Sequence, residues 1–199
     1  MPLQQNAQRL LKVGPLSVFT LLLVLPAYSQ GDKQTKKEHH DNAAEFLPSV
    51  KKSTECSVSG KNPDADCTPG AAMGISKTAV CTTSTKGRRN VDESMRKEVY
   101  ASYGLSYPQP TGKYEVDHFI PLELGGSNDL SNLWPQLASP MPGFHQKDCV
   151  EDYLHAQVCK QGATMTLAEA QRQITTDWLK IYTDKAKGSG IGQCKKWGK

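Results

Sequence analysis

The six cysteines constrain the fold of this 199-residue chain more than any other feature. They all lie after residue 55, at Cys56, Cys67, Cys81, Cys149, Cys159 and Cys194. An even number without a Cys-x-x-Cys pair is typical of a disulfide framework in an oxidising compartment, and it disfavours a thioredoxin-like redox centre or a zinc knuckle. We therefore predict three disulfides, whose connectivity the spacing leaves open.

One pairing can be excluded from the sequence. Cys149 and Cys159 fall on one expected helix, about 15 Å apart along its axis, which is too far for a disulfide. Each must reach another part of the chain, either the segment from Cys56 to Cys81 or Cys194 in the tail.

The N-terminus has the order of a secretory signal. Residues 1–12 are polar and basic, residues 13–25 are apolar (VGPLSVFTLLLVL), and the small residues Ala27 and Ser29 follow. The apolar stretch is shorter than the roughly 20 residues that a membrane-spanning helix needs, which disfavours an anchor. We expect residues 1–30 to be a signal peptide, so that the mature protein acts in the periplasm or outside the cell.

Composition excludes several classes of protein. Three Trp, seven Tyr and four Phe can build an ordinary core, so the chain is not wholly disordered. The 24 basic and 20 acidic residues give a net charge of 24 − 20 = +4, which falls to +2 when the two cations of the signal are removed. This charge is too small for a histone-like protein that coats phosphates.

After the signal peptide, the expected organisation has three parts. Residues 31–55 are a flexible polar leader, residues 56–186 form one domain, and residues 187–199 are a basic C-terminal tail. Within the domain, residues 56–86 are rich in Gly, Pro, Ser, Thr and Cys, which predicts loops and short strands stapled by disulfides. The remaining pattern mixes helices and strands, so we expect an α+β fold.

Hydrophobic periodicity locates the main elements. The expected elements are a helix over 92–103, a strand over 113–120, a second short strand at 132–134, and helices over 144–160 and 167–186. Asp92 is placed to cap the first helix, and Thr166 with Glu169 forms a capping box for the last. Trp178 belongs to the apolar stripe of the last helix, so we assign it to the core.

The residues that carry chemistry are concentrated in YEVDHFIPLELGGSNDLSNLWPQ, residues 114–136, and GFHQKD, residues 143–148. Neighbouring side chains on a strand point to opposite faces, so Asp117 and His118 can serve one site only where the strand ends. The Gly-Gly turn that follows brings an Asn-bearing strand back beside them, and a helix begins near His145.

This segment resembles the HNH endonuclease family, whose ββα-metal motif has an Asp-His pair, a Gly-rich loop, an Asn and a later His or Asn. The wider pattern, from GRRNV through EVDHFIPLELGG and NLWPQ to the AQ…I…DW helix, is similar to a group of exported bacterial HNH proteins. The resemblance covers roughly residues 67–183 and implies a small ββα-metal core with additional helices.

The family implies a role for each matched position. His118 matches the general base that takes a proton from the attacking water, and Asn132 matches the residue that holds the loop so that the base keeps its orientation. Asp117 and His145 match the ligands of a divalent metal ion, which the residue types leave open among Mg, Mn, Ca and Zn. Asp148, one turn after His145, is an alternative ligand.

Two arginines and a second asparagine are further candidates for the site. Arg88 and Arg89 lie in the basic segment KGRRNVDESMRK and are candidates for phosphate binding, because a guanidinium can donate two hydrogen bonds to one phosphate. Asn128 is an alternative to Asn132, but its Ser-Asn-Asp setting is typical of a turn. We interpret His155, in the middle of a helix, as structural.

The sequence therefore predicts an exported, metal-dependent endonuclease that hydrolyses phosphodiester bonds of DNA or RNA with little sequence specificity. The alternative is a non-catalytic secreted domain that binds nucleic acid or another partner on the same frame. A nuclease toxin directed at competitors would share the chemistry of the first hypothesis.

Overall fold

The structure is a computed structural model that describes residues 49–59 and 61–199. The predicted signal peptide and residues 31–48 of the predicted leader lie outside these residues. In the described part of the chain, no helix is both long enough and apolar enough to cross a membrane.

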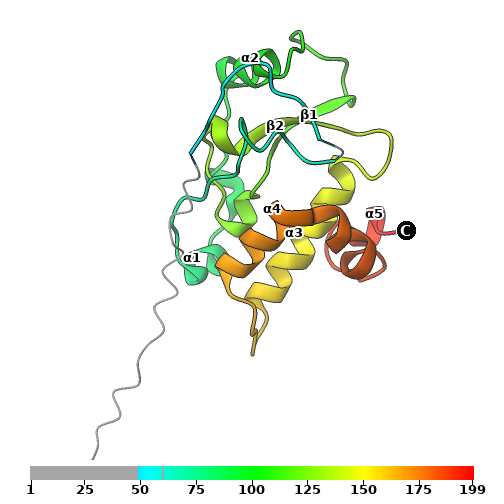
Figure 1. The fold of residues 1–199 in the computed structure, drawn as a ribbon. Coiled ribbons are helices and arrows are strands. Elements are labelled where there is room, and N and C mark those ends of the chain that lie inside the picture. The colour runs from blue at the N-terminus through cyan, green and yellow to red at the C-terminus, as the bar shows by residue number, and fades with distance from the viewer. Residues whose placement is uncertain (1–48, 60) are drawn as a thin grey trace, which may run out of the picture. The chain divides into compact units, whose positions relative to one another are not determined.

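The architecture is α+β, as predicted (Figure 1). Its main elements are α1 (Lys77–Thr82), α2 (Glu93–Ser102), β1 (Tyr114–His118), β2 (Leu133–Leu137), α3 (Phe144–Cys159), α4 (Leu167–Ile181) and α5 (Cys194–Trp197). Four short helical turns join them: η1 (Thr85–Gly87), η2 (Leu122–Leu124), η3 (Leu130–Asn132) and η4 (Tyr182–Ala186). Each of the five predicted elements is therefore present, with bounds that differ by a few residues.

Helix capping follows the sequence closely. Asp92 accepts a hydrogen bond from the amide of Met95 at 2.8 Å and begins α2. Thr166 accepts from the amide of Glu169 at 3.1 Å and begins α4. The other half of the predicted capping box does not form, because the carboxylate of Glu169 instead binds Arg172 and Gln173 on the next turn.

The segment 56–86 differs from its prediction. It contains the helix α1, whose first turn is capped by Ser76, and its described residues make only isolated bridges, between Ser59 and Asn62 and between Ala72 and Gly126. Val80 explains the helix, because it is buried in the main core together with α3. Tertiary packing therefore decided a conformation that the Gly- and Ser-rich sequence did not indicate.

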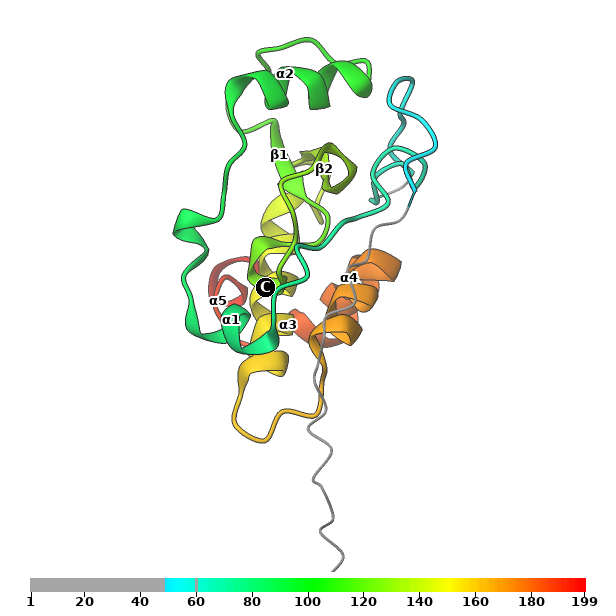
Figure 2. The same ribbon diagram turned by 90° about the vertical axis from the view of Figure 1, so that its left-hand side faces the viewer.

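The two strands form an antiparallel pair that separates two cores (Figure 2). Val116 and Leu133 point to one face of the strand pair and pack in a small core with residues of α2. Trp134 points to the other face and packs in the core of α3 and α4. Asp117 is the register partner of Trp134, so it belongs to the face that α3 covers.

The main core lies between α3 and α4, which run side by side in Figure 1. Val150, Leu154 and Val158 on α3 pack in one cluster with Ile174 and Trp178 on α4, and all five are fully buried. The assignment of Trp178 to the core is confirmed.

Three disulfides hold these elements, as the cysteine count predicted. Cys56 is joined to Cys67, Cys81 of α1 to Cys159 at the end of α3, and Cys149 of α3 to Cys194 of α5. Cys149 and Cys159 are not joined to each other, which confirms the exclusion made from helix geometry. The second and third bonds attach α1 and the C-terminal segment to α3.

We expect the Cys81–Cys159 bond to contribute more stability than the Cys56–Cys67 bond, because it closes 78 residues rather than 11. Chain entropy predicts that the double variant Cys81→Ser/Cys159→Ser loses about 4.5 kcal/mol of unfolding free energy, and that Cys56→Ser/Cys67→Ser loses about 3 kcal/mol. Urea denaturation of both variants measures the difference. A larger loss for the short loop would contradict the prediction.

Candidate functional site

A cavity of about 320 Å³ opens where β1 ends. The charged and titratable side chains that line it are Lys86, Arg89, Asp117, His118, Glu123 and Glu151. Asp117 and His118 can both line it because His118 is the last residue of β1, where the strict alternation of faces stops. The structure thus brings the predicted Asp-His pair to one cavity.

The ring of His118 is buried and has a defined orientation. Its Nε2 lies 3.1 Å from Oδ1 of Asn128. The amide of Asn128 is oriented by two further bonds, since its Nδ2 donates to the carbonyl of Arg88 and its Oδ1 accepts from the amide of Asn90. Nε2 of His118 therefore carries the proton, and Nδ1 keeps a free lone pair.

This Nδ1 is a buried nitrogen without a hydrogen-bond partner among the described residues. Burial lowers the pKa of His118, and the bond to Asn128 offsets this effect in part. The imidazole is therefore neutral near pH 7, the state in which it can accept a proton.

Asn132 holds the loop that follows β1. Its Oδ1 accepts from the amides of Ala71 and Ile120, and its Nδ2 donates to the carbonyls of Ile120 and Ser127. The loop packs so closely that a Cβ at Gly126 would lie 1.7 Å from the carbonyl oxygen of Ile120. The side chain that fixes the loop and the side chain that orients His118 are therefore different asparagines, and Asn128 does more than form the expected turn.

A buried ammonium group lies beside the Asp-His pair. Lys147 of α3 has no exposed side-chain surface, and its Nζ lies 2.8 Å from Oδ2 of Asp117 and 2.5 Å from Oε1 of Glu151. It also donates to the backbone carbonyl of His118 at 2.7 Å. Burial opposes its charge, but the two carboxyl groups outweigh burial and raise the pKa of Lys147. The residue pattern did not predict Lys147 or Glu151 for the site, although their i, i+4 spacing places them on one face of α3.

Other carboxyl groups around the cavity hold protons more tightly than usual. Burial raises the pKa of Glu151 well above its ordinary value, and Lys147 opposes this rise. Burial, followed by the charges of Asp117 and Glu115, raises the pKa of Asp148 to about 7. The site therefore binds protons at a pH where exposed carboxyl groups have lost them.

Glu123 is paired with a second carboxyl group. Burial, followed by the charge of the neighbouring Asp152, raises its pKa to about 7. Asp152 also accepts from the backbone amide of Gln193 at 2.6 Å. Glu123 therefore holds its proton up to about pH 7, and the bond from Gln193 fixes the position of the Asp152 carboxylate.

The basic segment before α2 borders the cavity. Arg89 and Lys86 line it, and Arg89 lies 3.9 Å from the carboxylate of Glu115. Arg88 donates through Nη2 to the carbonyl of Thr83, whereas its Nε and Nη1 are buried without a partner among the described residues. Both predicted phosphate-binding residues therefore lie near the site, with Arg89 facing the cavity.

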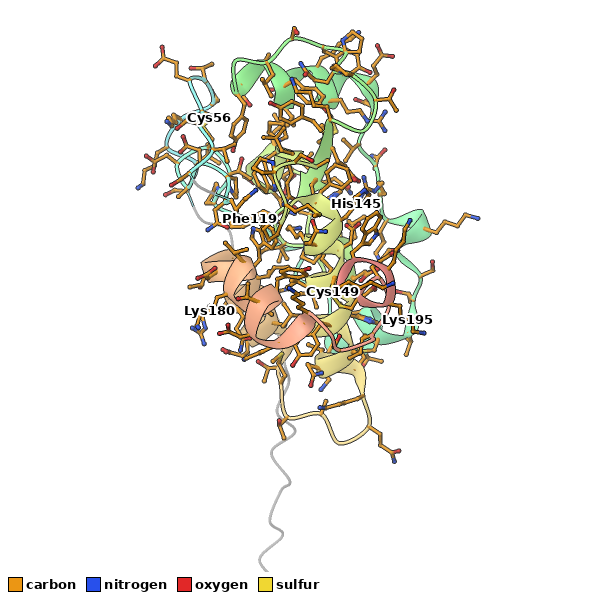
Figure 3. The ribbon with its side chains drawn as sticks, turned by 90° about the vertical axis from the view of Figure 1, so that its right-hand side faces the viewer. Cys56, Phe119, His145, Cys149, Lys180 and Lys195 are labelled. Atoms are coloured by element: carbon orange, nitrogen blue, oxygen red, sulfur yellow. A yellow bond between two sulfur atoms is a disulfide. The ribbon has the colours of Figure 1, made fainter. Side chains whose placement is uncertain are left out.

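His145 is not among the residues that line the cavity. It lies on the first turn of α3 (Figure 3). Its ring stacks on Trp197 with the centroids 4.0 Å apart. Its Nδ1 is 3.8 Å from Oδ2 of Asp148. In the described residues, no group of three His, Cys, Asp or Glu ligand atoms within 4.8 Å contains Asp117 or His145. The described residues thus show no three-ligand cluster at either predicted ligand, and the cation beside Asp117 is Lys147.

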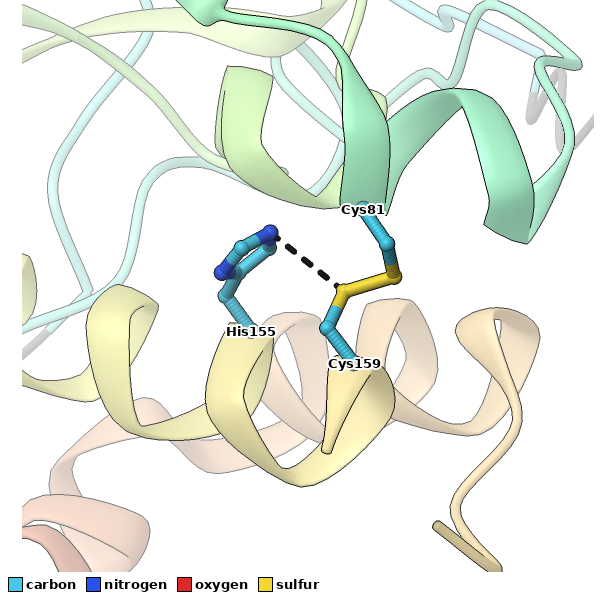
Figure 4. A group of neighbouring side chains, drawn as sticks. All are labelled: Cys81, His155 and Cys159. Atoms are coloured by element: carbon cyan, nitrogen blue, oxygen red, sulfur yellow. Dashed lines mark hydrogen bonds between the residues drawn. A yellow bond between two sulfur atoms is a disulfide. The ribbon is translucent and has the colours of Figure 1, made fainter. Parts of the chain in front are cut away.

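One group in the described chain does have the composition of a metal site. The ligand atoms of Cys81, His155 and Cys159 all lie within 4.8 Å of one another (Figure 4). Nε2 of His155 is 3.4 Å from the sulfur of Cys159, but the two sulfurs form a disulfide. Metal ligation requires thiolates, so this group could hold an ion only after reduction.

Comparison with protein-family models, with curated proteins and with solved structures finds no match for this chain. The interpretation of the site depends on its geometry and on the residue pattern.

We expect the Lys147→Met variant to lose about 3–5 kcal/mol of unfolding free energy at pH 8, because two buried carboxyl groups lose their counter-charge. Without the ammonium, the folded-state pKa of Glu151, which burial already raises, rises further above its unfolded value. The penalty should therefore shrink at pH 5, where both states can be protonated. Urea denaturation at both pH values measures it.

Lys180→Met is the matched control, because Lys180 forms an i, i+4 pair with Asp184 on an exposed surface. It should change stability by less than about 0.5 kcal/mol. Equal losses in the two lysine variants would contradict a special contribution from the buried cluster.

Proposed function

We propose that this protein is an exported hydrolase that cleaves phosphodiester bonds of nucleic acid, with His118 as the general base. The observation that carries the proposal is the free Nδ1 of a buried, oriented and neutral imidazole on the wall of a cavity that also contains basic side chains. A base in this state can take a proton from a water molecule that attacks phosphorus. Asn128 fixes the tautomer of His118, and Asn132 fixes the loop that follows His118 and carries Asn128.

The basic side chains give the cavity a preference for phosphate. Lys86 and Arg89 face it from one segment, and Nε and Nη1 of the intervening Arg88 are buried without a partner among the described residues. Such groups bind the backbone and not the base edges, so the proposed cleavage has little sequence preference and acts on DNA or RNA.

A divalent metal is supported by the resemblance to HNH endonucleases and not by the ligand pair predicted for it. Asp117 lines the cavity, but its carboxylate is already engaged by the amide of His118 and by Lys147. If an ion binds, it would supply Lewis-acid chemistry to the phosphate. Metal dependence is therefore something for the assay to establish.

Export agrees with the covalent structure. The six cysteines all form disulfides, which persist in oxidising compartments and are rare in the cytosol. We therefore propose that the protein acts in the periplasm or outside the cell after residues 1–30 are removed.

One observation favours the non-catalytic alternative. The ammonium of Lys147 lies beside the carboxylate that the resemblance assigns to a metal, as expected of a frame that has lost its ion. A binding domain of this kind would retain affinity for nucleic acid through Lys86 and Arg89, without cleavage.

The test is digestion of plasmid DNA and of RNA by the oxidised full-length chain, with Mg, Mn, Ca or Zn and with EDTA. We expect cleavage by the wild-type protein and a loss of about 100-fold or more in His118→Ala, because a general base contributes roughly that factor. Product sizes on gels and single-turnover rates measure the change.

His155→Ala is the matched control, since His155 is a half-buried histidine outside the cavity, at the Cys81–Cys159 disulfide. It should keep the activity. If correctly oxidised wild-type protein cleaves neither substrate with any of the metals, the binding domain replaces the enzyme.

A further inference from the structure

We propose that Glu123 is the general acid of this site and protonates the leaving oxygen while His118 removes a proton from water. This inference rests on the proposed phosphodiester hydrolysis and assigns a second catalytic residue to it. Glu123 belongs to η2, only five positions after His118, and both side chains line the same cavity.

The two side chains present complementary unsatisfied atoms. Nδ1 of His118 and Oε2 of Glu123 are both buried, and neither has a donor or acceptor partner in the hydrogen-bond network of the described residues. A buried polar atom without a partner is costly, and a catalytic role is one explanation for such an atom. One of these atoms can accept a proton, and the other can carry one.

Burial, and then the charge of Asp152, keep the proton on Glu123. The carboxylate of Asp152 accepts from the amide of Gln193, and two adjacent carboxyl groups cannot both be charged at low cost. Asp152 and Lys147 face Glu123 from α3, and Arg88 faces it from the segment after η1, the two cations opposing the effect of Asp152. Lys86, Arg89, Asp117, His118 and Glu151 share the cavity. Together these groups leave Glu123 protonated up to about pH 7.

The proton balance of the step is complete with water as the only co-reactant. Oxygen of water forms a bond to phosphorus as Nδ1 of His118 takes one of its protons. The bond from phosphorus to the leaving oxygen breaks, its electron pair stays on that oxygen, and the carboxyl proton of Glu123 joins it. The products are a phosphate monoester and a hydroxyl end. Transfer of the proton from His118 to Glu123 through solvent restores the site.

The test compares two leaving groups in the Glu123→Gln variant. A nucleic acid leaves as an alkoxide and needs a proton, whereas bis(4-nitrophenyl) phosphate leaves as a stable phenolate and does not. We expect the variant to lose about 100-fold or more on nucleic acid but only a few-fold on the activated ester. Glu98→Gln, an exposed change on α2, should leave both activities at the wild-type level.

The pH dependence gives a second readout. Wild-type cleavage of nucleic acid should fall as the pH rises through about 7, because Glu123 then loses its proton. This fall should be absent in the residual activity of Glu123→Gln. In Asp152→Asn it should move to lower pH, because removing the neighbouring negative charge lowers the pKa of Glu123.

The outcomes separate the two proposals. A wild-type protein that cleaves neither substrate defeats the proposed function, and the role of Glu123 with it. Active wild-type protein with equal losses on both substrates in Glu123→Gln, or with no loss on either, overturns the general acid alone. If Glu123→Gln does not fold by circular dichroism, the Asp152→Asn profile decides, and an unmoved alkaline limb overturns the assignment.

Discussion

The buried ammonium of Lys147 connects the helix α3 to the end of β1. It contacts Asp117 on the strand, Glu151 on its own helix and the carbonyl of His118, all without exposure to solvent. Removing charges from water is costly, and the cost is recovered only when the geometry satisfies each group. This requirement fixes where α3 lies against the strand pair, and it therefore fixes which residues can border the cavity.

The same cluster determines the chemistry that the cavity can perform. The ammonium group of Lys147 provides the positive charge beside Asp117. The other titratable groups of the cavity are suited to proton transfer. A neutral imidazole with a free Nδ1 and a carboxyl group with a pKa of about 7 line one space. Paired groups with such opposite tendencies are typical of acid–base sites, and this supports the roles proposed for His118 and Glu123.

The site was predictable to the extent that it depends on local order. The Asp-His pair at a strand end, the Gly-Gly turn and the structural Asn132 could all be located from residues 114–136. The hydrogen-bond partners of the site residues could not be predicted, because they come from distant segments. Asn128 is held by the carbonyl of Arg88, and Asp152 is held by the amide of Gln193. The contacts of His145 were the hardest to predict, because its ring stacks on Trp197, a residue more than 50 positions later in the sequence.

The sequence by itself determined the α+β class, the five principal elements, the need for three disulfides and the strand end that bears the Asp-His pair. These features follow from periodicity, capping and cysteine count, which act over a few residues or require no geometry. Tertiary structure alone decided the pairing of the cysteines, the helix α1 and the position of Lys147. A disulfide needs its Cα atoms within about 7 Å and a buried charge needs its partners within hydrogen-bonding distance, so both depend on how remote segments pack.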